Sequence, residues 1–168
     1  IPLLVRWPAG LGCNGRVLDA PVNSEDLMPT LLRLAGVARP ATVEGLDYSG
    51  YLRGGPNPGD GEAVLSCVSP FGEFARLLGG REYRGLRTNR YTYVRDLTGP
   101  WLLFDNERDP YQLNNLVGRP EAADLQRDLN TRLDKKLRAQ GDEFLPGPTY
   151  VARWRYQTDA TGTVPYTR

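Results

Sequence analysis

Three acidic residues form the densest group of side chains that could do chemistry in this sequence. Asp105, Glu107 and Asp109 alternate along a short stretch, and alternate carboxylates on a loop can converge on one divalent cation. The glycine at a sharp turn and the later glutamate ligand of an EF-hand loop are absent. Asp105 and Asp109 also suit a turn that their side chains cap and brace. We expect this second role, and hence no metal site in the chain.

Other catalytic residue types are scarce. The chain has no histidine, which removes the commonest general base and a frequent metal ligand. Its two cysteines, Cys13 and Cys67, show no pattern typical of a disulfide framework or a zinc site, so we expect free thiols. No Ser-His-Asp, Cys-His or phosphate-loop arrangement can be assembled. The sequence therefore predicts no catalytic residue and no cofactor in this chain.

Basic and aromatic side chains could still contact a ligand. A set of five arginines gives one region a basic character, which suits either an anionic ligand or a solvated sheet face: Arg81, Arg84, Arg87, Arg90 and Arg95. The segment YVARWRY, residues 150–156, could stack on sugar rings or bases, or pack against another domain. Loops are the usual place for specificity, so Phe71, Arg76 and Trp154 are our candidates for the wall of a substrate cleft.

Length and composition restrict the class of protein. The 168 residues suit one domain, or one domain with a fragment of another. A net charge of +1 gives no reason to expect a nucleic-acid partner. No apolar run approaches the roughly 20 residues of a membrane-spanning helix, so we expect no membrane partner. The chain opens without methionine inside a strand-like run, which predicts that it was cut from a larger protein or had its upstream part removed.

Hydrophobic patterning predicts the elements that position these residues. The opening IPLLVRW has the length and flanks of a buried strand, and residues 29–35 suit a short buried helix that Gly36 ends. Residues 62–68, 83–88, 91–96 and 101–105 are strand candidates with short connections, which favour antiparallel pairing. A helix over about residues 120–140 carries leucines spaced by four, which can cover one face of the sheet: Leu125, Leu129, Leu133 and Leu137.

The predicted fold class is therefore α+β, with a small four-stranded antiparallel sheet packed by one C-terminal helix and preceded by a strand and a helix. We expect boundaries that divide the chain into residues 1–55, residues 56–141 and an aromatic-rich arm, residues 142–168, without helical or strand periodicity. Residues 1–35 should expose apolar surface and an open strand edge, so self-association is expected.

Several segments together resemble the C-terminal part of the sulfatase family, within the alkaline-phosphatase-like superfamily. The opening IPLLVRWPAG is similar to a late strand of that family's core, and DAPVNSEDLMPTLLRLAGV to the helix that follows. VEGLDYSGYLRGG is similar to a loop of the family. GLRTNRYTYVRD and WLLFDNERDPYQLNNLVGRPE resemble its sheet motifs, with Gln112 where glutamate is commoner.

The resemblance implies that residues 1–55 are the tail end of an α/β catalytic domain, and that the following sheet and helix brace it. It also implies a parent enzyme that hydrolyses sulfate esters of a small molecule or glycan, with formylglycine and calcium. Neither cysteine fits the modification motif, since Cys13 precedes Asn14-Gly15-Arg16 and Cys67 precedes Val68-Ser69-Pro70. The chain alone should be inactive. A carbohydrate- or protein-binding module, or the same part of a phosphate or phosphonate ester hydrolase, remains an alternative.

Overall fold

The computed structural model describes residues 2–159 and residue 164. Internal contacts divide the chain into two compact units, Ile1–Ala63 and Val64–Arg168. The boundaries that we expected near residues 55 and 141 stay predictions. No helix among the described residues is long and apolar enough to cross a membrane.

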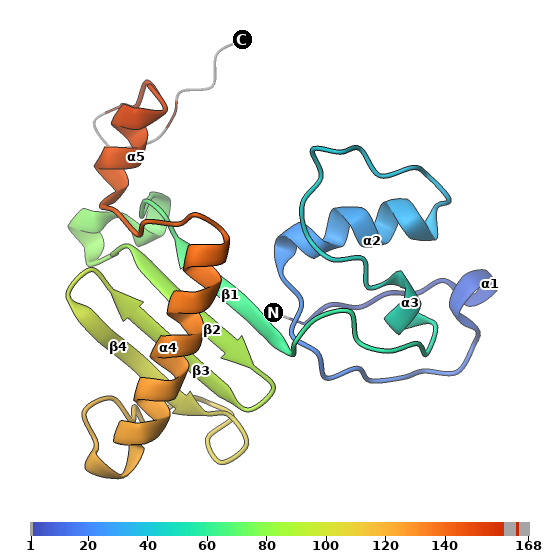
Figure 1. Ribbon diagram of the computed structural model, residues 1–168, viewed down its shortest axis with the longest axis horizontal. Coiled ribbons are helices and arrows are strands. Elements are labelled where there is room, and N and C mark those ends of the chain that lie inside the picture. The colour runs from blue at the N-terminus through green and yellow to red at the C-terminus, as the bar shows by residue number, and fades with distance from the viewer. Residues whose placement is uncertain (1, 160–163, 165–168) are drawn as a thin grey trace. The chain divides into compact units, whose positions relative to one another are not determined.

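The described residues of the first unit form three short α-helices, α1 (Pro8–Leu11), α2 (Leu27–Leu34) and α3 (Ser49–Leu52), with a 3₁₀ turn, Ser24–Asp26, before α2 (Figure 1). The helix expected over residues 29–35 is α2, and Gly36 follows it with a φ of 72°, the left-handed conformation expected of a helix stop. The opening run differs from the prediction of a strand, because residues 2–7 are irregular. A strand needs a hydrogen-bonded neighbour, and no described residue supplies one.

Buried polar side chains, instead of a large apolar core, hold the first unit together. Asp26 is 2% exposed, and its carboxylate accepts hydrogen bonds from the backbone N–H groups of Leu46 at 2.7 Å and Asn23 at 2.8 Å. Thr30 Oγ1 accepts the N–H of Tyr48 at 2.9 Å. These bonds connect α2 and the turn before it to the segment that leads into α3.

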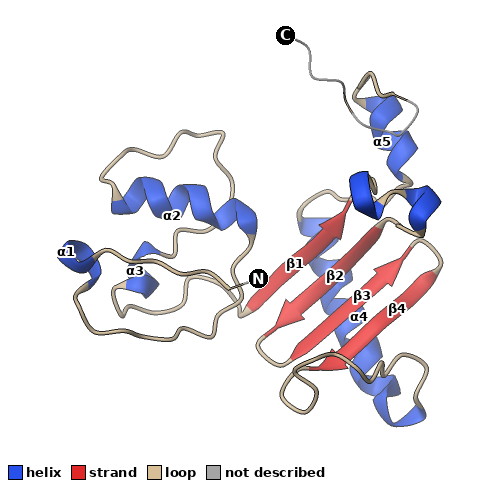
Figure 2. Cartoon of the chain, turned by 180° about the vertical axis from the view of Figure 1, so that it is seen from behind, coloured by secondary structure: helices blue, strands red, loops and turns tan. Residues whose placement is uncertain are grey.

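The second unit is built on a four-stranded sheet of β1 (Glu62–Cys67), β2 (Tyr83–Thr88), β3 (Tyr91–Asp96) and β4 (Gly99–Asp105), in the order β1-β2-β3-β4. Every strand pairs with its neighbour in sequence, and Figure 2 shows the alternating strand directions. All four predicted strands are present, and β2 and β3 have the predicted bounds. The antiparallel sheet is thus confirmed.

The β3–β4 hairpin is closed by a tight turn between Asp96 and Gly99. Asp96 Oδ1 accepts hydrogen bonds from the backbone N–H of Thr98 at 2.7 Å and from its hydroxyl at 2.6 Å. Asp therefore stabilises the turn locally, as this residue type commonly does. The register shifts between Val94 and Arg95, where the strand departs from regular pairing.

One long helix, α4 (Ala123–Ala139), covers one face of the sheet across β2 and β3 (Figures 1 and 2). A short 3₁₀ turn, Pro120–Ala122, leads into α4, and Gly141 follows it with a φ of 67°. Leu129 and Leu133 are fully buried and Leu137 is 3% exposed, while Leu125 is partly buried. These leucines pack against sheet residues of the same core: Leu86, Tyr93 and Leu103. The helix predicted over residues 120–140 is confirmed.

The arm after α4 contains a helix that the sequence did not predict. α5 (Gly147–Arg153) begins with Pro148 in its first turn, a position where proline needs no hydrogen-bonding N–H. Seven residues are too few to show a helical hydrophobic period. Figure 1 shows α5 beyond the end of the sheet, where β1 leads into the loop of residues 68–82. The helix corrects the expectation of an arm without periodic structure.

Candidate functional site

The acidic stretch after β4 is a braced turn. Arg90 Nε and Nη2 donate to the two carboxylate oxygens of Asp105 at 3.0 and 2.6 Å, and the N–H groups of Glu107 and Arg108 also donate to Asp105. Asp109 accepts the N–H of Asn114 at 2.7 Å. The Arg90 hydrogen bonds hold the pKa of Asp105 below its usual value. The bracing role is confirmed, and the described residues contain no cluster arranged to hold a metal ion.

Both cysteines are free thiols, as expected. Cys13 is exposed, whereas Cys67 is partly buried at the end of β1. Burial raises the pKa of the Cys67 thiol, and the nearby Glu82 carboxylate raises it further. Because the thiolate is the nucleophilic form, the environment of Cys67 disfavours nucleophilic chemistry.

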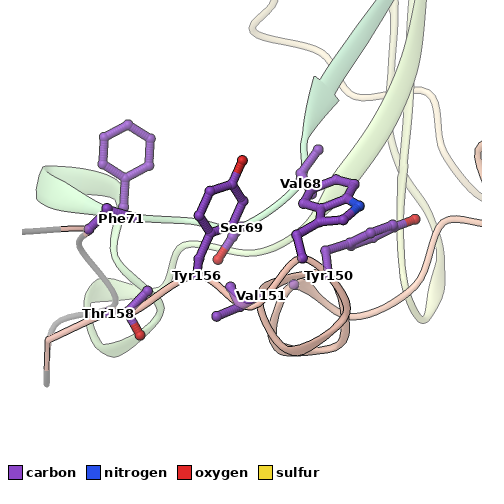
Figure 3. A pocket seen from close by; sticks show the side chains of 10 residues that line it. Val68, Ser69, Phe71, Tyr150, Val151, Tyr156 and Thr158 are labelled. Carbon is purple, nitrogen blue, oxygen red and sulfur yellow. The ribbon is translucent and has the colours of Figure 1, made fainter.

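A pocket of about 310 Å³ lies between the loop after β1 and the α5 arm (Figure 3). Its lining is mainly apolar and aromatic, with a few hydroxyl groups, and consists of Val68, Ser69, Phe71, Gly147, Tyr150, Val151, Trp154, Tyr156, Thr158 and Val164. Ligand pockets in proteins typically have this composition, and this volume is at the small end of their range. We call this the arm pocket.

Two of the three wall residues predicted from the sequence line the arm pocket. Phe71 and Trp154 contribute from opposite sides, the loop and the arm, and their side chains are 67% and 55% exposed. Arg76 is not among the lining residues. Its guanidinium instead forms an ion pair with Glu82, at 2.8 Å between Nη1 and Oε2. Arg76 therefore holds the loop in place without facing the pocket.

Glu82 joins the loop to the start of α5. Its side chain is 2% exposed, and Oε1 accepts the backbone N–H of Gly147 at 2.7 Å. Burial opposes ionisation of this carboxyl group, but the hydrogen bonds from Arg76 and Gly147 outweigh it, so the pKa of Glu82 is lowered. A Cβ atom on Gly147 would lie 2.9 Å from Ser69 atoms, so only glycine permits this approach of the helix to the loop.

A second buried ion pair fixes the arm to the sheet. Arg84 on β2 is 1% exposed and binds Asp142, with Nη2 at 3.2 Å from Oδ1. Asp142 Oδ1 also accepts the hydroxyl of Tyr150 at 3.0 Å, and this hydroxyl accepts the N–H of Leu145 at 3.1 Å. The Tyr150 hydroxyl is thus fixed as both a donor and an acceptor. A wall fixed in this way loses little conformational entropy on binding.

Three aromatic rings form a continuous group along the arm. The ring centroids of Tyr150 and Trp154 are 5.2 Å apart, and those of Trp154 and Tyr156 are 6.1 Å apart with an interplanar angle of 82°. The sequence indicated that residues 150–156 could stack on sugar rings, but only Trp154 was selected from this segment as a wall residue. The spacing of Tyr150 and Trp154 could have indicated that their rings lie together, since residues four apart share one face of a helix.

Residues 1–140 match the family model described as "N-sulphoglucosamine sulphohydrolase, C-terminal". The chain belongs to this family. The predicted resemblance to the C-terminal part of sulfatases is thereby confirmed, and the sheet and α4 are its domain fold. The arm that carries α5 lies after the matched residues, so the arm pocket combines a loop of the sulfatase domain with a segment outside the family model.

Individual relatives agree with this assignment. The chain is 39% identical over 157 residues to an "Ulvan-active sulfatase" of Formosa agariphila, covering 93% of this chain and 30% of that protein. It is 25% identical, with a TM-score of 0.59, to a protein solved "in complex with its substrate D-Glucosamine-2-N, 6-O-disulfate", covering 70% and 24% of the two chains. The phosphonate monoester hydrolase of Agrobacterium radiobacter is 26% identical, with a TM-score of 0.59 and coverage of 79% and 27%. The chain therefore spans less than a third of the length of these relatives.

Proposed function

We propose that this domain is part of an enzyme that hydrolyses sulfate esters on a glycan, that it braces the catalytic domain, and that the arm pocket forms one wall of the substrate cleft. Formylglycine and calcium would provide the nucleophile and the charge stabilisation in such an enzyme. The residues of this chain do not fit either group. Neither cysteine has the modification motif, and Asp105 is already bound to Arg90 and to backbone N–H groups. Both groups would be held by residues outside this chain.

The arm pocket is the observation that carries the proposal. Glu82 and Asp142 fix the arm against the loop, so the exposed Phe71 and Trp154 face a common space in the absence of any ligand. Exposed aromatic rings that share a pocket suggest a binding surface, because an isolated fold gains more by burying them. The flanking hydroxyl groups of Ser69, Tyr156 and Thr158 can exchange hydrogen bonds with a polar ligand.

A sugar ring suits this pocket better than a fully apolar ligand. Pyranose rings present C–H faces that pack on aromatic rings and hydroxyl groups at their edges, which match the aromatic and hydroxyl parts of the lining. The names of two relatives, one active on ulvan and one bound to a sulfated glucosamine, support a sulfated sugar as the ligand.

Two alternatives have support of their own. The likeness to a phosphonate monoester hydrolase favours a parent that hydrolyses phosphonate or phosphate esters with the same architecture. The exposed aromatic group of the arm favours a non-catalytic module that binds carbohydrate or protein. Under the first alternative the intact protein hydrolyses phosphonate or phosphate esters, and under the second it hydrolyses no ester.

The test compares hydrolysis by the full-length protein of a sulfate ester, a phosphate ester and a phosphonate monoester that share one aryl leaving group. Our proposal predicts the highest kcat/KM for the sulfate ester. Preference for the phosphonate or phosphate ester would favour the first alternative, and no turnover of any ester would favour the second. The 168-residue chain alone should hydrolyse none of them, and turnover above that of its Asp109→Ala variant would contradict the absence of a catalytic site.

A further inference from the structure

Arg87 differs from the other arginines of the sheet region. Four of the five form ion pairs with aspartates: Arg81 with Asp96, Arg84 with Asp142, Arg90 with Asp105 and Arg95 with Asp134. Arg87, on β2, forms no ion pair with any residue that the structure describes. The positive charge of the region is thus neutralised by a neighbouring aspartate at four of the five arginines, and Arg87 keeps a charge that no described residue compensates.

The hydrogen bonds of Arg87 leave one edge of its guanidinium available. Nη1 donates to Thr92 Oγ1 at 2.7 Å, while Nε and Nη2 donate to no described residue. Neither nitrogen is among the described buried atoms that lack a partner, so solvent reaches this edge. In Arg90 the corresponding edge binds a carboxylate, because Nε and Nη2 donate to the two oxygens of Asp105. The same bidentate geometry is open to an oxyanion at Arg87.

Two amide groups donate to the same hydroxyl oxygen as Arg87. Thr92 Oγ1 also accepts from Asn106 Nδ2 at 3.1 Å and from Gln112 Nε2 at 3.0 Å. The two amide nitrogens also donate elsewhere, Asn106 Nδ2 to the Arg90 carbonyl oxygen and Gln112 Nε2 to Asn106 Oδ1, both at 2.7 Å. Arg87 therefore shares its one described acceptor with two amide groups, and a further acceptor would bind at its Nε and Nη2 edge. Gln112 is exposed, which places this side of the cluster at the surface.

The charge of Arg87 is also poorly compensated. The side chain is half-buried on the sheet, and burial lowers the pKa of its guanidinium. Arginine nevertheless stays protonated in proteins, so the cost of partial desolvation remains in the folded state. A negative group at the open edge would offset that cost. The geometry, the donors and the charge therefore favour the same class of ligand.

We propose that Arg87, with Asn106 and Gln112 beside it, is a binding site for an oxyanion, namely a sulfate or carboxylate group of an acidic sugar. The oxyanion chemistry rests on the contacts of Arg87. The acidic sugar as its carrier rests on the proposed function. The site uses residues of β2 and of the segment after β4, and none of them lines the arm pocket.

The experiment titrates the ¹⁵N-labelled 168-residue chain with sodium sulfate and, separately, with sodium acetate, at constant ionic strength held with sodium chloride. The reporters are the Arg87 Nε–Hε resonance and the backbone amides of Asn106 and Gln112. A saturable shift at these three groups is expected with sulfate, acetate or both, and the stronger ligand identifies the group that the site prefers. Resonances that move with neither anion would overturn the proposal.

Two variants and a matched control test the residues. Arg87→Met removes the guanidinium and should abolish the response. Gln112→Glu places a carboxylate beside the oxygen that Arg87 contacts, so it should compete with the anion and weaken sulfate or acetate binding by about tenfold or more. Arg138→Met removes an exposed arginine from α4 and should leave the titration unchanged.

The result for Gln112→Glu decides the question even if Arg87→Met does not fold, because residue 112 is exposed and lies outside the core. Unchanged anion binding in Gln112→Glu would overturn the proposal. A separate titration distinguishes anion binding at Arg87 from sugar binding in the arm pocket. Glucosamine 6-sulfate and glucosamine, titrated into the chain and into its Trp154→Ala variant, distinguish contacts that need the sulfate at Arg87 from contacts that need the aromatic ring.

Discussion

Glu82 and Gly147 are 65 residues apart in the sequence, and the backbone N–H of Gly147 donates to the buried Glu82 carboxylate at 2.7 Å. The same carboxylate is paired with Arg76 on the loop after β1. One side chain therefore connects both walls of the arm pocket. The shape of the arm pocket thus depends on a buried carboxylate that does not line it.

Glu82→Gln should loosen the arm while the sheet and α4 remain folded. The amide can still accept the N–H of Gly147, but it cannot neutralise Arg76, so we expect a loss of about 1–2 kcal/mol in the local stability of α5. Hydrogen exchange measured by mass spectrometry should be faster in peptides that cover α5 and unchanged in those that cover α4. Glu143→Gln is the control, because it breaks the half-exposed pair with Arg153. Equal exchange of α5 in both variants would contradict the role of Glu82.

The attachment of the arm should depend on pH in the acid range. The pKa values of Glu82 and Asp142 are both lowered: burial alone would raise them, but hydrogen bonds from arginine side chains and backbone N–H groups outweigh it. A carboxyl group with a lowered folded pKa contributes stability that is complete above its unfolded value of about 4 and is lost as pH falls through the folded value. Trp154 fluorescence should therefore change below about pH 4. The combined Glu82→Gln and Asp142→Asn variant should not show this transition, and its persistence there would assign it to other groups.

Leu129→Asp should unfold the second unit, because it places a charge in the core between α4 and the sheet, where Leu129 is fully buried. We expect a loss of about 3 kcal/mol or more in the free energy of unfolding. Thr131→Asp introduces the same side chain at an exposed position of the same helix and is the control. Urea unfolding followed by circular dichroism measures both variants. A Leu129→Asp midpoint equal to that of Thr131→Asp would mean that this face of α4 is not in the core.

Self-association through the first unit stays a prediction. Leu4 is 92% exposed and Leu31 is 57% exposed, and both belong to segments that the sequence predicted to be buried. Sedimentation velocity should show species larger than the monomer whose fraction falls in the Leu4→Ser, Leu31→Ser variant. Leu113→Ser changes an 80% exposed leucine in the second unit and should have no effect. A monomer at all concentrations would refute the prediction.

Local patterns allowed most of the second unit to be predicted from sequence. β2 and β3 end at strong turn signals, and the leucines of α4 repeat at helical spacing, so their bounds follow from neighbouring residues. The opening run could not be judged in this way, because a strand depends on a partner elsewhere. α5 is too short for a period, and its position depends on Glu82 and Arg84, far away in sequence.

The candidate site was predictable only as separate residues. Phe71 and Trp154 were selected because they are aromatic and lie outside the regular elements that the sequence predicts, but their meeting in one pocket requires the buried bonds of the arm. Arg76 was selected because it lies in the same loop as Phe71, and the structure shows that it contacts Glu82 instead. Arg87 differs from the other four arginines because each of those forms an ion pair with an aspartate. No sequence pattern predicts these ion pairs.

The central claim is that the arm pocket contacts the substrate of a sulfatase. The direct measurement is kcat/KM of the full-length enzyme, its Phe71→Ala variant and its Trp154→Ala variant for a sulfated oligosaccharide and for a small aryl sulfate. We predict that each variant lowers kcat/KM for the oligosaccharide by about tenfold, since about 1.4 kcal/mol of contact is lost, and leaves the aryl sulfate and the melting temperature unchanged. An unchanged ratio of the two kcat/KM values in both variants would show that the pocket does not contact the substrate.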